Sequence, residues 1–351
     1  MSELFMNHKK WQNYSEEELN VYAEKIFNYY REKGFPHFEL TMEERIKIFK
    51  NLDNFDTTNI IEGDILKQVM NGLNLVNYYM PHMWSVKCNS FTTPMDCYID
   101  DIMFKKAIMK RLKHGANISD AGIRKVLSWT AGTHRVSNFR PTVAKYIYDN
   151  YAGDGRVLDF SSGFGGRLLG AMTSDKVDSY TGTDPNTETF KQLTRMTREL
   201  NPFHEKVIIL YNKPFEEFEA GLDDFGDQIK FDLSFSSPPY FNTEEYSYEE
   251  TQSFVRYNTS DKWREGFLRP LIEKNFNIIK DDGYFIINIA NVKTYKNLEE
   301  DTLKIAKESG FILVETLKMA LSKMMNSGYK FEPVFVFKKV IDNNFDQTVV
   351  V

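Results

Sequence analysis

The stretch that decides the fold is Arg156-Val-Leu-Asp159-Phe-Ser-Ser-Gly163-Phe-Gly165-Gly166-Arg167. Its opening residues, Arg156–Phe160, are mostly apolar and are typical of a short buried strand. The glycines that follow allow a sharp turn and a close approach of the backbone to a ligand. The apolar run after Arg167 predicts a helix, whose first N–H groups have no partner within the helix. We therefore expect a strand–loop–helix unit, which either binds an adenosine-bearing cofactor or is an ordinary tight turn.

Outward from this unit, short apolar runs alternate with helical patterns. The pattern predicts helices at 167–172, 188–200 and 263–279, and strands at 156–160, 179–183, 207–211, 231–236, 284–290, 311–319 and 333–338. Such alternation indicates an α/β fold with a doubly wound, mostly parallel sheet. Ligands of such sheets bind at the carboxyl ends of the strands.

The chain before residue 135 reads as helical. Ser15–Glu18 and Thr41–Glu44 have the form of capping boxes, and apolar residues recur at helical spacing in 21–30, 46–52 and 102–112. We predict three segments: a helical N-terminal region for nucleic-acid recognition (1–134), a catalytic domain (135–340) and a C-terminal tail (341–351).

Composition excludes several classes of protein. The chain has 351 residues, 42% of them hydrophobic and 27% charged, as in globular proteins of about two domains. It contains no apolar run of about 18 residues and begins without an apolar signal core, so we expect neither a membrane span nor secretion. Two cysteines cannot form a disulfide scaffold, and the six histidines lack metal-ligand spacing. We expect a metal-free protein of the cytoplasm, in a bacterial or a virus-infected cell.

Charge is unevenly distributed along the chain. The formal net charge is −6, but residues 105–145 contain ten Lys and Arg against one acid, Asp120, a net of +9. The remainder therefore carries −15, and the net charge does not exclude a nucleic-acid partner.

Two acids flank the predicted loop. Asp159 ends the first strand, and Asp184 follows the second in Thr183-Asp184-Pro185. A carboxylate at the second position can accept both ribose hydroxyls of a cofactor. The loop is not G-x-G-x-x-G, which disfavours nicotinamide binding, and an acid beside it would repel a pyrophosphate. It suits a cofactor with a sulfonium and an ammonium group.

The fourth strand runs into Ser236-Ser237-Pro238-Pro239-Tyr240-Phe241. Proline has no N–H, so this stretch cannot continue a sheet ladder. It predicts a stiff wall at the carboxyl end of the strand, with the Ser237 hydroxyl and carbonyl oxygens as acceptors and Tyr240 as a flat face.

Together, Asp-x-x-x-Gly-x-Gly and Ser-Pro-Pro-Tyr resemble the S-adenosylmethionine-dependent amino-methyltransferases of DNA, over residues 138–340. Phe139-Arg-Pro-Thr142 and Phe331-Glu-Pro-Val-Phe-Val-Phe337 extend the likeness. The resemblance implies a seven-stranded Rossmann-like sheet and S-adenosyl-L-methionine as cofactor. The expected cofactor-binding residues are Phe139, Pro141, Asp159, Ser161, Gly163, Gly165, Asp184, Pro185, Asn212 and Ser236. The expected catalytic residues are Ser237, Pro238, Pro239 and Tyr240.

The resemblance leaves the target base open. Ser-Pro-Pro-Tyr is usual in cytosine-N4 enzymes, whereas a glycine loop that comes first is more usual in adenine-N6 enzymes. In either case, Ser237 and the Pro238 carbonyl would accept the hydrogens of the amino group, and Tyr240 would stack on a base flipped out of the duplex. Cytosine-C5 chemistry is disfavoured, because neither Cys88 nor Cys97 lies in a strand–turn motif.

Two further segments have open interpretations. The aromatic and acidic stretch 242–263 is either a loop that closes over the site or an excursion packed on the sheet. The basic segment either contacts phosphates or is a solvated helix face; the expected contacts are Lys110, Arg111, Lys113, Arg124 and Lys125.

We expect a DNA methyltransferase of the restriction–modification kind. The alternatives are an RNA base methyltransferase, a protein-glutamine methyltransferase and an inactive nucleic-acid-binding subunit.

Overall fold

The computed structural model describes residues 8–223, 225–324 and 328–340. By their internal contacts these residues form two units. Unit 1 comprises residues up to Glu39, Met80–Ser137 and Glu244–Tyr246, and unit 2 comprises Leu40–Tyr79, Asn138–Thr243 and the residues from Ser247 onward. The predicted boundary at residue 134 lies close to one junction, but 40–79 belongs with the sheet. The predicted tail, 341–351, lies outside the described residues.

Unit 1 is mainly helical. Its elements are α1 (His8–Trp11), α2 (Glu16–Lys33), a 3-10 turn (Pro81–Ser85), β3 (Lys87–Cys88), α5 (Pro94–Ile99), α6 (Asp101–Lys113), α7 (Asp120–Leu127) and β8 (Glu244–Glu245). The capping box predicted at Ser15 is formed, since Glu18 N donates to Ser15 Oγ (3.2 Å) and Ser15 N donates to Glu18 Oε2 (2.7 Å). The core lies between α2, α6 and α7, around Ile26, Phe104 and Ile123.

Unit 2 begins with a short helical segment. It contains α3 (Met42–Asp53), a 3-10 turn (Thr57–Ile60), β1 (Ile61–Glu62), β2 (Ile65–Leu66) and α4 (Leu73–Tyr79). The capping box predicted at Thr41 is formed at the start of α3.

The rest of unit 2 alternates strands and helices, as predicted. The strands are β4 (Arg156–Asp159), β5 (Ser179–Thr183), β6 (Val207–Tyr211), β7 (Phe231–Ser236), β9 (Ile279–Asn288), β10 (Phe311–Met324) and β11 (Gly328–Lys339). The helices are α8 (Pro141–Tyr151), α9 (Gly166–Met172), α10 (Thr187–Leu200), α11 (Ser253–Arg256), α12 (Ser260–Trp263), α13 (Arg269–Ile278) and α14 (Leu298–Glu308), with 3-10 turns at Asn201–Phe203 and Phe215–Glu217.

These strands form one sheet in the order β1-β2-β10-β11-β9-β7-β4-β5-β6. The ladders that join β6, β5, β4, β7 and β9 are all parallel, and β11 is antiparallel to both β9 and β10. The predicted doubly wound, mostly parallel α/β sheet is therefore confirmed. Two short strands from 61–66, β1 and β2, widen it to nine, because β2 pairs with β10 at Lys318–Met319.

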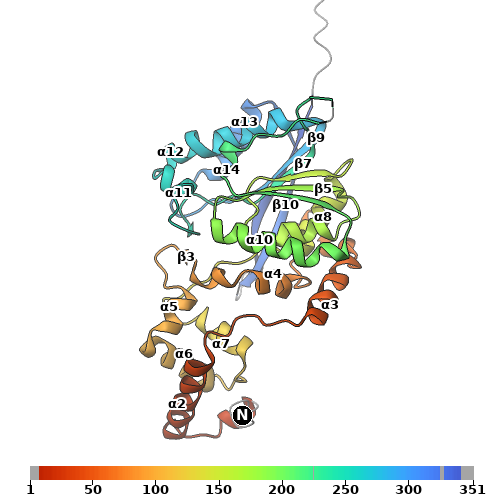
Figure 1. The fold of residues 1–351 in the computed structure, drawn as a ribbon. Coiled ribbons are helices and arrows are strands. Elements are labelled where there is room, and N and C mark those ends of the chain that lie inside the picture. The colour runs from red at the N-terminus through yellow and green to blue at the C-terminus, as the bar shows by residue number, and fades with distance from the viewer. Residues whose placement is uncertain (1–7, 224, 325–327, 341–351) are drawn as a thin grey trace, which may run out of the picture. The chain divides into compact units, whose positions relative to one another are not determined.

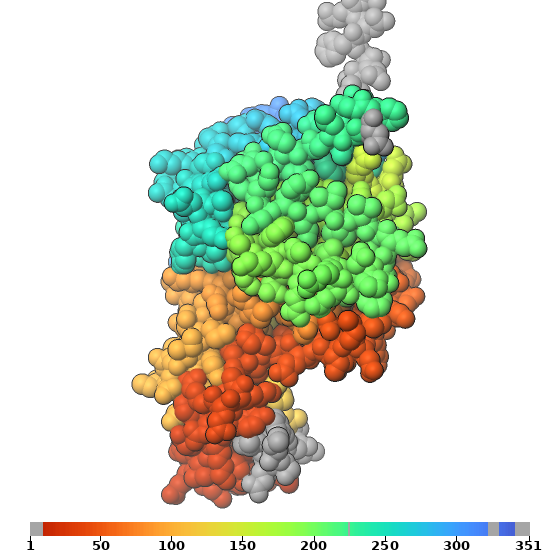
Figure 2. All heavy atoms as spheres, viewed as in Figure 1, coloured from red at the N-terminus to blue at the C-terminus, as the bar shows by residue number. Residues whose placement is uncertain are grey.

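Helices cover both faces of this sheet. Figure 1 shows α8 and α10 on one face and α13 and α14 on the other. Between the sheet and the second pair lies an aromatic core that includes Phe160, Phe285 and Phe337. The surface of α10 faces the viewer in Figure 2. A hollow of about 450 Å³ is lined by residues of α10 and β6 that include Phe190, Arg198, Ile208 and Leu210.

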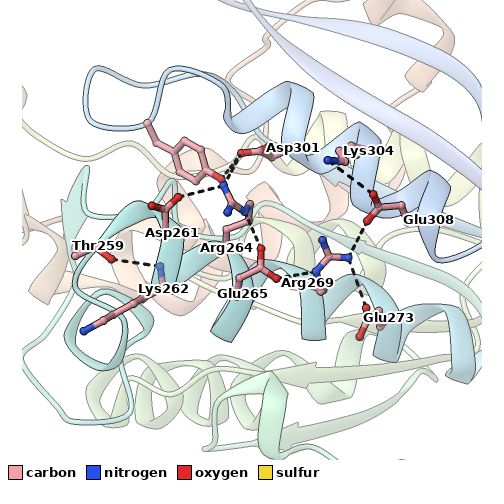
Figure 3. A network of polar contacts seen from close by, with 11 residues as sticks. Thr259, Asp261, Lys262, Arg264, Glu265, Arg269, Glu273, Asp301, Lys304 and Glu308 are labelled. Carbon is pink, nitrogen blue, oxygen red and sulfur yellow. Dashed lines mark hydrogen bonds and ion pairs between the residues drawn. The ribbon is translucent and has the colours of Figure 1, made fainter.

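The helix predicted at 263–279 is interrupted. The chain instead forms α12, a π-helical turn (Arg264–Leu268) and α13. Pro270 lacks the N–H that a regular helix would direct to residue 266, which accounts for the interruption. Ion pairs of Arg264 and Arg269 with carboxylates of α12, the π-helical turn, α13 and α14 hold this segment (Figure 3).

Candidate functional site

The predicted site residues of unit 2 follow one edge of the sheet. β4, β5, β7 and β9 are parallel, so their carboxyl ends meet at this edge. β11 runs the opposite way, and its pairing with β9 begins there with Val334 opposite Asn288. Two kinds of residue therefore lie at this edge: those that follow β4, β5, β7 and β9, and those that come just before the part of β11 that pairs with β9.

Asp159 is buried at the end of β4 and has four donors. Arg167 Nε and Tyr180 Oη each donate to its Oδ2 (both 2.8 Å), and Ser236 Oγ (2.7 Å) and Ser161 N (3.2 Å) donate to Oδ1. Arg167 is 4% exposed. Burial lowers the pKa of Arg167, but the Asp159 charge and its hydrogen bond raise it more, so the net shift is upward. The structure thus makes Asp159 the partner of a buried arginine, which sequence analysis missed, and its negative charge is neutralised there.

The glycine loop packs tightly against the segment before α8. Gly165 precedes α9 with φ of 80°, a conformation that favours glycine. A Cβ on Gly166 would overlap the carbonyl oxygen of Phe139, and Asn138 Nδ2 donates to Phe164 O (3.0 Å). The Arg167 guanidinium lies over the Phe139 ring, 5.3 Å from its centre. Phe139, together with Pro141 at the start of α8, is thus brought to the loop as expected.

Asp184 lies just after β5 and is 8% exposed. Gly163 N donates to its Oδ2 (2.8 Å) and Asn186 N to its Oδ1 (2.9 Å). Burial raises the pKa of this carboxyl to about 6, although the two backbone hydrogen bonds lower it in part. Asn212, which follows β6, donates through Nδ2 to the Asp184 carbonyl (3.1 Å). The structure therefore joins the ends of β5 and β6 to the glycine loop.

The Ser-Pro-Pro-Tyr turn follows β7 beside this loop. Ser236 is fully buried, and its hydroxyl bonds Asp159 and the Ser161 carbonyl, which makes it a link between β7 and β4. Pro238 is buried, whereas Ser237, Pro239 and Tyr240 are half-buried. The next residue, Phe241, has φ of 56°, a left-handed conformation that is rare for a bulky side chain and is found at strained functional turns.

Ser237 and Tyr240 belong to a cluster that sequence analysis did not find. Asn288 Oδ1 lies 3.2 Å from Ser237 Oγ and 3.1 Å from Tyr240 Oη, and Glu332 Oε2 lies 3.2 Å from Tyr240 Oη, so the single hydroxyl hydrogen of Tyr240 can be donated to either acceptor. Asn288 is fixed by its Nδ2 bond to the Pro333 carbonyl (2.9 Å). Burial raises the pKa of Glu332 above its ordinary value. The sequence did contain a signal for Glu332, because it is the charged residue in the otherwise apolar run 331–337.

The segment after Tyr240 lies over the end of β5. Thr251 Oγ1 donates to the Pro185 carbonyl (3.3 Å), and the Glu249 carboxylate accepts from Thr187 N at the start of α10 (3.1 Å). Trp263 anchors the far end, fully buried and bonded through Nε1 to Ser253 Oγ (3.1 Å). These contacts pack the segment on the edge that carries Asp184. Closure over a ligand stays a prediction.

The residues expected to contact phosphate all lie in unit 1, and most have internal partners. Lys110 Nζ donates to Trp129 O, Arg111 Nε to Asn117 O (both 2.9 Å), and Arg124 to Pro36 O (2.8 Å). Lys113 pairs with Glu16 of α2 (2.7 Å). Lys125 is exposed.

The basic segment 105–145 does not belong to one structural unit. The segment 105–145 is divided between the two units, and Lys145 is buried in unit 2, where it donates to Thr173 O. Helix packing also brings the acids of α2 against α6, as in the ion pair of Lys105 with Glu24 (2.8 Å). Net charge along the sequence could not show either effect.

The donors and acceptors at the end of β5 fit a ribose-bearing cofactor. Each Asp184 oxygen accepts one backbone N–H, and a carboxylate has capacity for about four hydrogen bonds, so acceptors remain for hydroxyl hydrogens. Asn212 is exposed and Ser161 half-buried beside it. Since Arg167 neutralises Asp159, Asp184 is the acid of the pair that would meet a cationic cofactor.

Metal-ligand clusters, membrane-spanning helices and free thiols were the other features expected or excluded from the sequence. No group of three His, Cys, Asp or Glu there could hold a metal ion. Among the same residues, no helix is long and apolar enough to span a bilayer. Cys88 and Cys97 are buried free thiols, and burial raises the pKa of Cys88 to about 11, so this thiol is a poor nucleophile at neutral pH.

No family model matches the chain, and no curated protein matches it. Solved structures similar to it include a methyltransferase from Pyrococcus furiosus (16% identity, 57% of this chain and 83% of that chain, TM-score 0.37). A second is an S-adenosylmethionine-dependent methyltransferase from Methanosarcina mazei (14% identity, 56% of this chain and 98% of that chain, TM-score 0.39). A third is magnesium protoporphyrin IX methyltransferase from Synechocystis with bound S-adenosylmethionine (12% identity, 57% of this chain and 79% of that chain, TM-score 0.39). The fold assignment rests on strand order and register.

Proposed function

We propose that the chain is an S-adenosylmethionine-dependent methyltransferase that modifies an exocyclic amino group of a DNA base, cytosine N4 or adenine N6. The observation that carries this proposal is the 2.7 Å hydrogen bond between Ser236 Oγ and Asp159 Oδ1. It joins the glycine loop to the Ser-Pro-Pro-Tyr turn, so a cofactor held at one would face a base held at the other. S-adenosylmethionine, when bound, would supply an electrophilic methyl group.

The turn suits an amino group that is conjugated with a ring. Such nitrogen is a poor nucleophile, because its lone pair is delocalised. Ser237 Oγ and the Pro238 carbonyl would accept its two hydrogens and draw the nitrogen towards tetrahedral geometry, which frees the lone pair. Methyl transfer is then a displacement that depends mainly on positioning. Tyr240 would stack on the extruded base.

The decisive experiment identifies the product. The protein is incubated with labelled S-adenosylmethionine and unmodified DNA or RNA, and the digested nucleosides are identified by mass spectrometry. We expect N4-methylcytidine or N6-methyladenosine in its deoxy form. Product from RNA alone would establish the RNA alternative, and binding of nucleic acid without any product would establish the inactive subunit.

Tyr240→Ala tests the placement of the base. We expect methyl transfer to fall roughly 5- to 150-fold, because base–aromatic stacking contributes roughly 1–3 kcal/mol. The cofactor dissociation constant, measured by calorimetry, should change less than about threefold, because Tyr240 is placed against the base and not against the cofactor. Phe225→Ala is the matched control, since Phe225 is 92% exposed in the turn before β7. Unchanged transfer by the Tyr240 variant would contradict the proposed site.

Unit 1 is proposed to hold the nucleic acid, with Lys125 its clearest phosphate contact. Lys125→Glu should weaken DNA binding and reduce the salt slope by about one for the lost contact. Fluorescence anisotropy over a salt series measures both quantities. Lys304→Glu in α14, a 68%-exposed lysine, is the control for net charge. Equal effects of the two changes would assign binding to net charge rather than to unit 1.

A further inference from the structure

Methylation of an amino group leaves a proton to be removed, and the proposed site lacks an evident base. The nitrogen becomes positively charged when it gains a methyl group and keeps its two hydrogens. Ser237, a proposed acceptor of the amino hydrogens, is a neutral hydroxyl whose conjugate acid is strong. Another group must therefore be the final acceptor of the proton.

The hydroxyl cluster offers a route to a carboxylate. Ser237 Oγ and Tyr240 Oη lie 3.5 Å apart, and either can be the donor, while Tyr240 Oη donates to Glu332 Oε2 at 3.2 Å. Glu332 is a carboxylate within hydrogen-bond distance of the Tyr240 hydroxyl, whereas Asp159, which Ser236 contacts, is already paired with Arg167. The cluster therefore runs from the turn to an acid on β11.

We propose that Ser237, Tyr240 and Glu332 form a proton path through which the methylated amino group is deprotonated. This inference rests on the proposed function and adds Glu332 as the final proton acceptor. β11 is antiparallel to its neighbour β9, which is why a residue that precedes their pairing reaches the edge where the parallel strands end.

The step balances in atoms and electrons. The nitrogen lone pair forms the N–C bond, and the C–S bond breaks with its electron pair on sulfur, which leaves a neutral thioether. One N–H bond breaks in the same step, as positive charge develops on nitrogen, and returns its pair to nitrogen. That proton passes to Ser237 Oγ as the Ser237 proton moves to Tyr240 Oη and the Tyr240 proton to Glu332 Oε2. Glu332 later releases the proton to water.

The surroundings of Glu332 suit a proton acceptor. Burial raises its pKa, and Glu299 of α14 raises it further, whereas the Tyr240 hydrogen bond, Lys330 on its own strand and Asn288 on β9 lower it. Across the strand pair it faces Met319 of β10, which does not titrate. A carboxylate with a raised pKa takes up a proton more readily near neutral pH.

An NMR titration tests the path without turnover. In protein labelled with ¹³C-glutamate, the Glu332 carboxyl is assigned by its loss in Glu332→Gln. We expect its pKa above the ordinary 4.5, and higher still in Tyr240→Phe, because that variant removes a hydrogen bond that favours the carboxylate. An ordinary pKa that Tyr240→Phe leaves unchanged would overturn the proposal.

Single-turnover methyl transfer from pH 5 to 9 tests the same path in action. The wild-type rate should rise with pH as Glu332 ionises and then level off. Tyr240→Phe keeps the aromatic ring, and Glu332→Gln keeps the shape of the side chain. Each variant should nevertheless slow methyl transfer on the order of 10²-fold, and its rate should no longer rise with pH. The double variant should be no slower than the slower single one, because both changes interrupt one path.

Glu315→Gln is the matched control. Glu315 lies in the same hairpin and also accepts from a tyrosine, Tyr151 Oη at 2.6 Å, but Tyr151 ends α8 ahead of β4, away from the site edge. This control should keep the wild-type rate and profile. A wild-type rate in Glu332→Gln, multiplied effects in the double variant, or a slower rate with an unchanged pH profile would each overturn the path. Wild-type protein that transfers no methyl group would overturn the proposed function, and the path with it.

Discussion

Two halves of one sheet edge use their polar side chains differently. In the glycine-loop half, formed by Asp159, Arg167 and Asp184, the carboxylates bond to backbone N–H groups, to a buried arginine and to two buried hydroxyls. In the hydroxyl half, formed by Ser237, Tyr240, Asn288 and Glu332, side chains bond mainly to one another, and Ser237 and Tyr240 are half-buried. Hydrogen bonds to the backbone fix the course of the chain, whereas side-chain hydroxyl networks can exchange protons and partners.

The difference teaches which acids are structural. Both Asp159 and Asp184 end strands, and by position alone either could meet a cofactor. Only the contacts separate them: Asp159 is fully buried and neutralised, and Asp184 is slightly exposed with a raised pKa. We therefore expect changes in the first to affect folding and changes in the second to affect binding.

The largest effect is expected from Asp159→Asn. It leaves the buried Arg167 guanidinium without its charged partner, and breaking a buried ion pair in this way costs about 3–5 kcal/mol. The free energy of unfolding of unit 2, measured by urea denaturation, should fall by that amount. Asp175→Asn, at an exposed turn, should have little effect. Equal stability of the two variants would erase the distinction between the halves.

A smaller effect is expected from pH at Asp184. Its folded pKa of about 6 exceeds the reference 3.8, so its own contribution to stability is present below pH 3.8 and is lost as pH rises through 6. In the proposed site the cofactor hydroxyls would donate to the Asp184 carboxylate, so the affinity for the cofactor should depend on pH in the opposite sense. Affinity for S-adenosylmethionine should fall about tenfold from pH 7 to pH 5, as the ionised fraction falls.

Calorimetry on Asp184→Asn checks this assignment. The variant cannot ionise, so the affinity it retains should vary little between pH 5 and pH 7. If it keeps the wild-type pH dependence, a different group controls cofactor binding, and the glycine-loop half has no titrating ligand.

The sequence predicted the elements of this edge better than their contacts. β5, β6 and β7 begin and end at the predicted residues, because each is a short apolar run bounded by polar or turn residues. Arg167 directly follows the glycine loop in the sequence. The site in which it meets Asp159 is completed by Tyr180 and Ser236, which come from other strands. Such pairings are set by strand order, which local patterns do not encode.

Glu332 shows the same limit more strongly. Its contact with Tyr240 spans 92 residues of sequence and exists only because β11 inserts antiparallel between β9 and β10. We expected site residues only at the carboxyl ends of the parallel strands. Glu332 instead precedes the residues of β11 that pair with β9, so that expectation did not include it. The divided basic segment has a related cause, since helix packing brought acids of α2 against lysines of α6.

The smallest effect is expected from a polar network away from the site edge, which sets the scale for surface contacts. Arg269 of α13 bonds Glu265 (2.8 Å) and Glu308 of α14 (2.9 Å), with Glu273 at 3.8 Å (Figure 3). It has as many charged partners as any arginine of unit 2, yet its side chain is 30% exposed and those of its partners 44–52%. Solvent screening limits each such pair to roughly 0–1 kcal/mol, so the loss of these pairs in Arg269→Ala should lower the unfolding free energy by about 1 kcal/mol, well below the loss expected for Asp159→Asn. A loss as large as that of Asp159→Asn would mean that burial does not distinguish the two networks.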